Sequence, residues 1–232
     1  MNELIKIKQE LKNLADTDKI PIYQNFFKTG KGQYGEGDIF IGVTVPNTRK
    51  IAKKYWEIPL ILVQELLESK IHEERLLSIL ILVQKYQKLN YDKIAKFYMQ
   101  HNKKINNWDL VDLSADKIIG HYYFNKNRSP LCKLAKSKNL WERRTAIVST
   151  FYFIKNNQFQ DTLKISRILL RDSHDLIHKA VGWMLREVGK RDKKILEKFL
   201  KENYKKMPRT MLRYSIEKFP EEERQKYLKN KI

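Results

Sequence analysis

The stretch HDLIHKAVGWMLREVGKR, residues 174–191, contains the helical pattern that recurs through the rest of the chain. At about 100° per residue, its apolar side chains fall on one stripe, made of Ile177, Val181, Met184, Leu185 and Val188. This spacing predicts an amphipathic helix whose stripe is buried. Because one helix cannot bury such a stripe alone, the pattern also requires neighbouring helices to pack against it.

Apolar residues recur at helical spacing almost everywhere else, and no convincing alternating strand pattern stands beside them. The helices pair, and the first helix of each pair is expected near positions 71, 107, 139, 174 and 208, roughly 35 residues apart. This period predicts an all-α solenoid of stacked antiparallel helix pairs, whose concave wall would suit a long ligand. Helices spaced in this way by chance are the alternative.

Residues 30–46, GKGQYGEGDIFIGVTVP, interrupt the helical pattern and hold five of the eight glycines. The glycines resemble those of a phosphate-binding cradle, but no G-K-[ST] sequence follows them. We therefore expect a long, flexible loop at this point in the chain.

The charge balance indicates an anionic partner. Lys and Arg outnumber Asp and Glu by 47 to 27 in the 232 residues, which gives a formal net charge of +20. Such a charge attracts polyanions, namely DNA, RNA or an anionic membrane surface. A genome rich in lysine codons is the alternative source of this excess. The single cysteine, Cys132, excludes a disulfide framework and a thiolate zinc site.

Targeting and membrane-spanning patterns are missing from the sequence. No apolar run approaches about 18 residues, and the first amphipathic segment lacks the continuous apolar core of a signal peptide. The sequence therefore predicts a soluble, cytoplasmic protein that does not enter a membrane.

Trp183 lies nearly opposite the apolar stripe of residues 174–191, with Lys179, Arg186, Glu187 and Lys190 on the same side. A tryptophan in a helix usually packs into the core. Here the core side is already filled, so we predict an exposed indole among cations, which suits contact with sugar, base or phosphate edges.

Trp108 and Asp112 are four residues apart in INNWDLVDLS, residues 105–114, within a helix that we expect over residues 106–123. They therefore share a face, whereas Asp109 projects elsewhere and is expected to assist the helix N-terminus. Asp112 is thus a carboxylate in an apolar and aromatic stripe. It is either a buried acid paired with an arginine or a reactive group on a ligand-facing wall.

The helix expected at LWERRTAIVSTFYFIK brings two adjacent arginines, Arg143 and Arg144, near the same wall if consecutive pairs stack side by side. The common hydrolase signatures are missing, because there is neither a G-x-S-x-G sequence nor a Ser-His-Asp order. His174 and His178 are four apart without the intervening acid of H-E-x-x-H, which favours helix capping or phosphate contact over a metal site. We expect neither a metal nor a cofactor.

Three segments resemble the signature helices of the AlkD-type DNA alkylation repair glycosylases: NNWDLVDLSADKIIG, NLWERRTAIVSTFYFI and DLIHKAVGWMLREVGKRD. GVTVPNTRKIAKKY resembles the N-terminal segment of that family and MPRTMLRYSIEKFP its C-terminal segment, so the resemblance covers nearly the whole chain. It implies one domain of HEAT-like repeats over residues 1–232 that grips duplex DNA in a basic concave groove. It also implies excision of 3-methyladenine and 7-methylguanine by cleavage of the N-glycosidic bond.

The resemblance also implies roles for individual residues. The catalytic carboxylate falls on Asp112, its partner aromatics on Trp108 and Trp183, and the arginine on Arg144. Further DNA contacts are expected from Tyr23, Arg143, Lys179, Arg186 and Lys190. We expect the protein to act as a monomer on duplex DNA that contains alkylated bases, without an obligate protein partner.

One carboxylate suffices for such a reaction because a purine alkylated on a ring nitrogen already carries the positive charge that a general acid would supply. The sequence offers no sign of a tight pocket for a flipped base. The resemblance to the AlkD-type glycosylases implies that the lesion stays stacked or exposed. Two other classes remain open. One is a non-catalytic helical-repeat module that binds nucleic acid, and the other is a protein-binding scaffold of the HEAT type.

Overall fold

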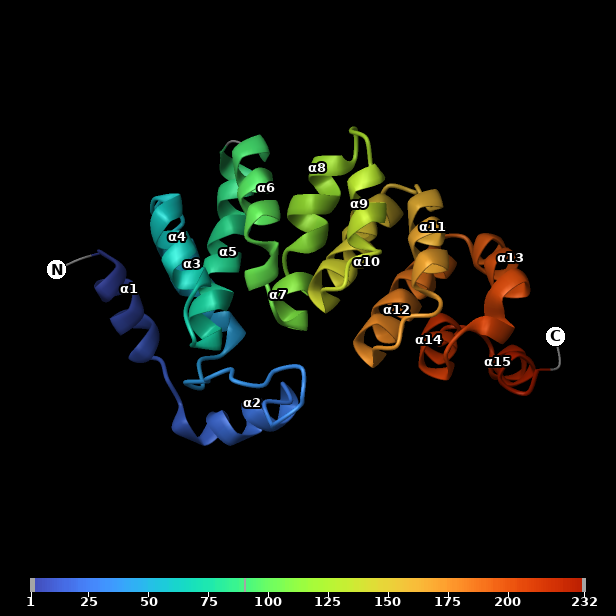
Figure 1. Cartoon of the computed structure of the whole chain (residues 1–232), viewed down its shortest axis with the longest axis horizontal. Helices are drawn as coiled ribbons and strands as arrows, with labels where there is room; N and C mark the ends of the chain where they lie inside the picture. The colour runs from blue at the N-terminus through green and yellow to red at the C-terminus, as the bar shows by residue number, and fades with distance from the viewer. Residues whose placement is uncertain (1–2, 90, 231–232) are drawn as a thin grey trace. The chain divides into compact units, whose positions relative to one another are not determined.

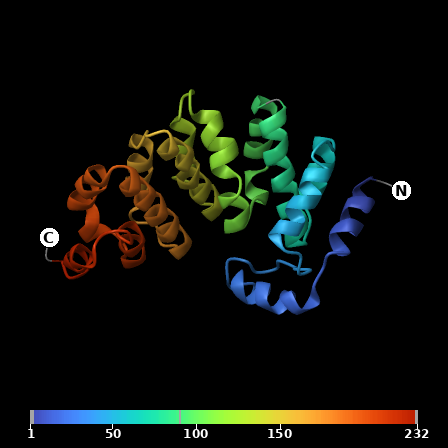
Figure 2. The same cartoon turned by 180° about the vertical axis from the view of Figure 1, so that it is seen from behind.

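The computed structural model describes residues 3–89 and 91–230, and within them the chain is all-α, without a β-strand (Figures 1 and 2). It divides into two compact units, Met1–Ser114 and Ala115–Ile232. Within the described residues, no helix combines the length and the apolar character needed to cross a membrane. The helical class predicted from the apolar spacing is confirmed.

The first unit is organised around α5, His72–Lys88, whose residues are almost all buried. Helices α3, α4, α6 and α7 all pack against α5, and α1 packs against α3. The other helices of this unit are α1 Glu3–Lys12, α2 Ile20–Phe26, α3 Val45–Lys54, α4 Leu60–Leu67, α6 Tyr91–Gln100 and α7 Trp108–Asp112, with 3₁₀ turns η1 Thr17–Lys19 and η2 Asn102–Lys104.

The second unit is organised around α12, Asp175–Arg191, which packs against α10, α11, α13 and α14. Its predicted stripe is buried at every position, since Ile177, Val181, Met184, Leu185 and Val188 are all 0% exposed. The other elements are the π-helical turn η3 Asp116–Gly120, α8 His121–Tyr123, α9 Ser129–Leu134, α10 Leu140–Lys155, α11 Gln160–Leu169, α13 Lys193–Asn203, η4 Tyr204–Lys206, α14 Arg209–Ser215 and α15 Glu221–Leu228.

The repeat period predicted from the sequence is confirmed. Helices α5, α7, α10, α12 and α14 begin at residues 72, 108, 140, 175 and 209, each within one residue of its expected start. Side-chain caps explain several of these starts. The Asn139 side chain accepts hydrogen bonds from the backbone of Trp141 and Glu142, and His174 accepts one from Leu176, so the predicted capping role of His174 is confirmed.

The helix expected over residues 106–123 is divided instead into α7, η3 and α8. Gly120, at the end of η3, packs so closely on α10 that a Cβ atom there would lie 2.3 Å from the carbonyl oxygen of Ser149. The apolar residues keep helical spacing across the division, which is why the sequence pattern predicted one continuous helix.

The glycine-rich loop between α2 and α3 is confirmed, but it is anchored where a flexible loop was expected. Phe40 and Val43 are buried in the first unit, and Ile39 forms an isolated parallel bridge with Ile71. Gly42 has a positive φ of 84°, and a Cβ atom there would lie 1.9 Å from the carbonyl oxygen of Asp16. Its second half is therefore a fixed wall of the first unit.

Candidate functional site

An aromatic pocket of about 300 Å³ lies within the first unit. Five of its lining residues are aromatic, and carboxylates and one histidine complete the wall. The lining residues are Tyr23, Phe26, Phe27, Phe40, Val43, Val45, His72, Glu73, Leu76, Trp108, Asp109, Asp112 and Leu113. The pocket thus brings together three of the predicted site residues, Tyr23, Trp108 and Asp112.

The indole of Trp108 is held by two phenylalanines from the end of α2. Phe27 stacks on it with ring centroids 5.1 Å apart and an interplanar angle of 13°, and Phe26 meets it edge-on at 5.4 Å. Tyr23, one turn earlier in α2, lies edge-on to Phe27 at 6.4 Å. Phe26 is 60% exposed although it is apolar, so this part of the pocket faces solvent.

Asp112 is the last residue of α7 and lies in the pocket wall. Its side chain is half-buried, and Trp108 at the other end of the same helix is half-buried too. The interpretation of Asp112 as a buried structural acid would require full burial. Asp112 is only half-buried, so the structure does not seal it inside the protein. A half-buried carboxylate beside aromatic rings interacts more strongly with a nearby positive charge than one in open water.

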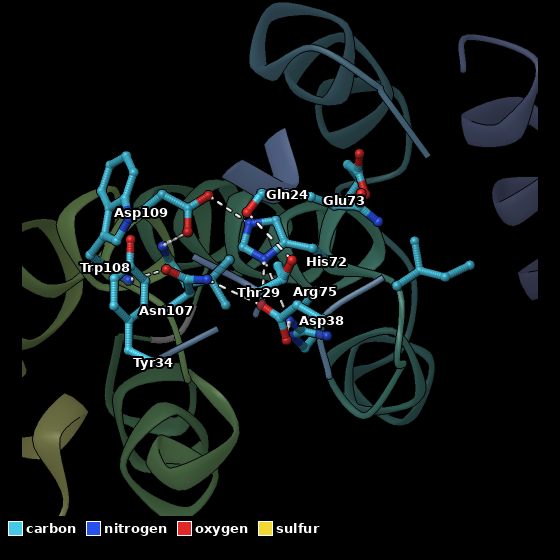
Figure 3. Close-up of polar contacts among 12 residues, drawn as sticks. Gln24, Thr29, Tyr34, Asp38, His72, Glu73, Arg75, Asn107, Trp108 and Asp109 are labelled. Carbon is cyan, nitrogen blue, oxygen red and sulfur yellow. Dashed lines mark hydrogen bonds and ion pairs between the residues drawn. The ribbon is translucent and has the colours of Figure 1, made fainter. Parts of the chain in front are cut away.

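A buried cluster of charged side chains adjoins the pocket: Asp38, His72, Arg75 and Asp109 (Figure 3). His72 and Asp109 also line the pocket. The Nε2 atom of His72 lies 2.8 Å from Oδ2 of Asp109, and its Nδ1 atom lies 3.3 Å from Oδ2 of Asp38. Arg75 donates to Asp38 at 2.7 Å. We refer to these four residues as the charge cluster.

The charge cluster keeps His72 protonated. Burial by itself would lower the pKa of His72, but the carboxylates of Asp109 and Asp38 outweigh burial and raise this pKa to about 9. Burial would raise the pKa of Asp38, but His72 and Arg75 lower it below the usual value. The cluster therefore consists of two anions and two cations at neutral pH.

Glu73, next to His72 on α5, fixes the loop that forms the opposite wall. Its carboxylate accepts hydrogen bonds from the backbone N–H groups of Ile41, Gly42 and Val43, at 2.8 to 3.2 Å. Burial raises the pKa of Glu73, although these hydrogen bonds oppose the shift. Glu73 is thus occupied in holding the loop, and it is buried, whereas Asp112 is half-buried in the pocket wall.

Sequence reasoning missed the charge cluster. The sequence pattern predicts for Asp109 only a role at the helix N-terminus and assigns no role to His72 or Arg75. Asp109 does accept a hydrogen bond from the Leu110 backbone at 2.8 Å, but its other oxygen contacts His72. The signal was that four charged or titratable residues, 72–75, stand directly before the apolar run of α5 and are buried with it.

Trp183 lies on α12 in the second unit, opposite the apolar stripe as predicted, and its side chain is half-buried. Its indole packs against Phe151 of α10, with ring centroids 5.6 Å apart. The position of Trp183 opposite the apolar stripe is confirmed, but the indole is half-buried where an exposed one was expected, because it packs on Phe151. Its contact with DNA stays a prediction.

Arg144 links α10 to the first turn of α12, and Arg143 links α10 to the segment that leads into α12. Arg144 is only 5% exposed and donates to the carbonyl oxygen of Leu176 at 2.6 Å. Arg143 forms an ion pair with Asp172 at 2.6 Å and donates to the carbonyl oxygens of Ser137 and Lys138. The predicted phosphate contact of Arg144 stays a prediction, and it would start from a buried guanidinium.

The three predicted cations of α12 each have an acidic neighbour. Lys179 lies 2.7 Å from Asp175, Lys190 lies 2.7 Å from Glu187, and Arg186 is paired with Glu217 of the segment after α14. This face is therefore a mixture of both charge signs. The single wall predicted from Trp108 and Asp112 in one unit and Trp183 in the other stays a prediction, as does the basic groove.

Comparison with known proteins identifies the family of the sequence and solved structures with a similar fold. The family model described as DNA alkylation repair enzyme matches residues 7–219. No curated protein matches the chain significantly.

Three solved structures share the fold. A predicted DNA alkylation repair enzyme from Enterococcus faecalis has a TM-score of 0.70 at 17% identity, over 89% of this chain and 97% of that one. The smu.31 protein from Streptococcus mutans UA159 has a TM-score of 0.53 at 18% identity, over 93% and 98%. AlkD2 from Streptococcus mutans has a TM-score of 0.53 at 15% identity, over 94% and 97%. Since the family model covers nearly all of the sequence, the chain belongs to the family of DNA alkylation repair enzymes.

Proposed function

We propose that the protein is a DNA glycosylase that excises cationic alkylated purines, 3-methyladenine and 7-methylguanine, from duplex DNA. The observation that carries this proposal is the half-buried carboxylate of Asp112 in an aromatic pocket wall, four residues from Trp108. Membership of a DNA alkylation repair family and the net charge of +20 support a DNA substrate. We propose a monomeric, cytoplasmic enzyme that needs no partner protein.

The proposed reaction is hydrolysis of the N-glycosidic bond. Alkylation at a ring nitrogen gives the purine a positive charge, so the base leaves as a neutral molecule and takes the bonding electron pair with it. Positive charge then develops on the deoxyribose ring. Asp112 would stabilise that charge and accept a proton from the water that attacks the anomeric carbon, which yields the free base and an abasic site.

The aromatic side chains have a role in the same scheme. The π face of Trp108 would favour cationic charge on the sugar, and Tyr23 would extend the apolar wall beside it. Trp183 and Arg144 in the second unit would contact the sugar and the phosphodiester, together with Arg143, Lys179, Arg186 and Lys190. No metal or cofactor takes part in this reaction.

Specificity would follow the charge of the lesion rather than its shape. A neutral adduct such as ethenoadenine lacks the positive charge that replaces the general acid, so its glycosidic bond should resist cleavage. Efficient release of ethenoadenine under conditions that release 7-methylguanine would contradict the proposed mechanism.

The test is base release from methylated duplex DNA by the wild type and Asp112→Asn. We expect Asp112→Asn to lower the single-turnover rate by at least about 100-fold, because a preorganised charge that acts on the transition state is typically worth that much. Binding to abasic-site DNA should change little. Asp18→Asn, which alters an exposed aspartate of η1 in the same unit, is the matched control and should keep the wild-type rate.

Two outcomes would overturn the proposal. Unchanged base release by Asp112→Asn would remove Asp112 from the mechanism. Tight binding of duplex DNA by a wild type that releases no base would instead favour the non-catalytic nucleic-acid-binding module.

A further inference from the structure

Helix α7 carries the two residues on which the proposed function rests, yet it cannot hold its own position. It spans only five residues, Trp108–Asp112, with Trp108 at the start and Asp112 at the end. A single helical turn is not stable by itself, because the entropy lost in ordering its backbone exceeds the free energy gained from its one or two hydrogen bonds. The contacts that α7 makes with its surroundings therefore determine where Trp108 and Asp112 lie.

The strongest polar contacts come from the charge cluster. Asp109, inside α7, is 6% exposed and lies 2.8 Å from Nε2 of His72. Asn107, just before α7, caps the helix through the Trp108 backbone and donates from its amide to Asp38 at 3.1 Å. Asp109 and Asn107 therefore both connect α7 to the charge cluster.

The geometry of His72 requires a charged imidazole ring. Each ring nitrogen lies within hydrogen-bonding distance of a carboxylate, Asp109 on one side and Asp38 on the other. A neutral imidazole carries one N–H group and one lone pair, so it can donate to only one of them. A lone pair on Nδ1 could accept from Arg75 at 3.4 Å, but it would then face the anionic oxygen of Asp38 at 3.3 Å. Only an imidazolium can donate to both carboxylates at once.

His72 also reaches Trp108 through an aromatic route. Its ring stacks on Phe40 with centroids 4.7 Å apart and packs on Phe27 at 4.8 Å. Phe27 in turn stacks on Trp108. An imidazolium packed against aromatic rings gains cation–π attraction that a neutral ring lacks.

The geometry points to His72 as a positioning residue for the proposed base excision: its imidazolium joins α5 and the Asp38 loop to α7, and thereby holds Trp108 and Asp112 in their reactive arrangement. His72 does not itself touch the reacting atoms. This inference rests on the proposed function and extends it to the residue that organises the site.

Loss of the His72 proton changes the charge balance of the cluster. With His72 charged, the anions Asp38 and Asp109 balance the cations His72 and Arg75. Without the proton, one buried negative charge is left uncompensated, and one carboxylate loses the hydrogen bond from His72. The other titratable groups around the ring are Glu73 on α5, which is bound to the loop backbone, and Tyr23 and Asp112, which line the same pocket.

The pH dependence follows from the raised pKa of His72. A group whose pKa rises from 6.5 in the unfolded chain to about 9 in the folded protein stabilises the fold fully below pH 6.5 and loses that effect as the pH passes 9. The arrangement of α7 should therefore hold at neutral pH and loosen between about pH 8 and 10.

The experiment compares single-turnover base release by the wild type and His72→Gln from pH 6.5 to 10. The ratio of the two rates cancels any titration of the substrate. We expect the wild type to be about 10- to 100-fold faster near neutral pH, because small displacements of catalytic groups have effects of this size. The ratio should approach one near pH 10. His101→Gln is the matched control, because His101 is a half-buried histidine in the same unit that contacts the Phe97 carbonyl, outside the charge cluster.

A purely structural role would give a different result, namely a pH-independent loss of rate or none. A ratio that stays constant over the whole pH range, or a His72→Gln rate equal to that of the wild type, would overturn the inference. If His72→Gln does not fold, Asp109→Asn serves as the second variant and should remove the same alkaline decline.

A readout without activity separates this inference from the proposed function. In the wild type, the NMR signals of the His72 ring and of the Trp108 indole N–H should titrate together near pH 9. A protein that releases no base but shows this coupled titration would refute the glycosylase and support the link from His72 to Trp108. Independent titration of the two signals would refute the link.

Discussion

Phe26 stands out among single residues because it is apolar, 60% exposed and in edge contact with Trp108. An exposed phenylalanine adds little to folding, since folding removes little of its surface from water. Its ring does, however, limit the rotation of the Trp108 indole on the side that faces solvent. The contact therefore matters more to the site than to stability.

Phe26→Ala should separate these two effects. We expect the midpoint of thermal unfolding to stay close to that of the wild type, while single-turnover base release falls by about 2- to 10-fold, the range that follows from the energy of one aromatic pair. Ile61→Ala removes another exposed apolar side chain, 59% exposed on α4 and outside the pocket lining, and should leave the rate unchanged. Equal losses in both variants would show that the effect of Phe26 is not specific to Trp108.

At the scale of elements, the loop between α2 and α3 owes its position to two contacts that are far apart in the sequence. Glu73 holds the backbone of residues 41–43, and Gly42 packs against the carbonyl oxygen of Asp16. The positive φ of Gly42, 84°, would already strain any other residue. The close approach adds a direct clash, because a Cβ atom would lie 1.9 Å from that oxygen.

Substitution of Gly37 and Gly42 by alanine distinguishes the cost of a strained φ angle from the cost of a steric clash. Gly37 has a similar φ of 85°, but nothing lies within 4 Å of a Cβ atom there. We expect Gly37→Ala to lower the free energy of unfolding by about 1 kcal/mol, and Gly42→Ala to lower it by clearly more, because strain alone costs about 1–3 kcal/mol and the backbone must also move. Urea unfolding of both variants measures the difference. Equal losses would mean that the approach to Asp16 relaxes without cost.

The elements also show which features the sequence could predict. The helix starts at 72, 108, 140, 175 and 209 follow from apolar spacing, which is local and was predicted within one residue. The short length of α7 and the anchoring of Phe40 depend on contacts with α5 and the loop, which no local pattern contains. The shared helix face of Trp108 and Asp112 follows from their spacing of four residues, which is local. The contacts of His72 with Asp38 and Asp109 join residues far apart in the sequence, so no local pattern predicts them.

For the whole molecule, the net charge of +20 predicts affinity for a polyanion but not where the charge acts. On α12 the cations lie beside acids, as in the pairs Lys179–Asp175 and Lys190–Glu187. Exposed ion pairs of this kind are weak, typically below about 1 kcal/mol. A phosphate can therefore replace the acid as the partner of such a lysine at little cost.

Salt dependence tests whether α12 takes part in DNA binding. The logarithm of the binding constant for undamaged duplex DNA should fall linearly with the logarithm of salt concentration, and each phosphate contact contributes about 0.9 to the slope. Lys179→Ala should reduce the magnitude of that slope by about 0.9, the contribution of one phosphate contact, and should weaken binding. The rate of base release at saturation should not change. Lys198→Ala, on an exposed part of α13 in the same unit, is the control and should keep the wild-type slope. If both variants have the wild-type slope, Lys179 does not contact the DNA backbone, and the charge that holds DNA must lie on other residues.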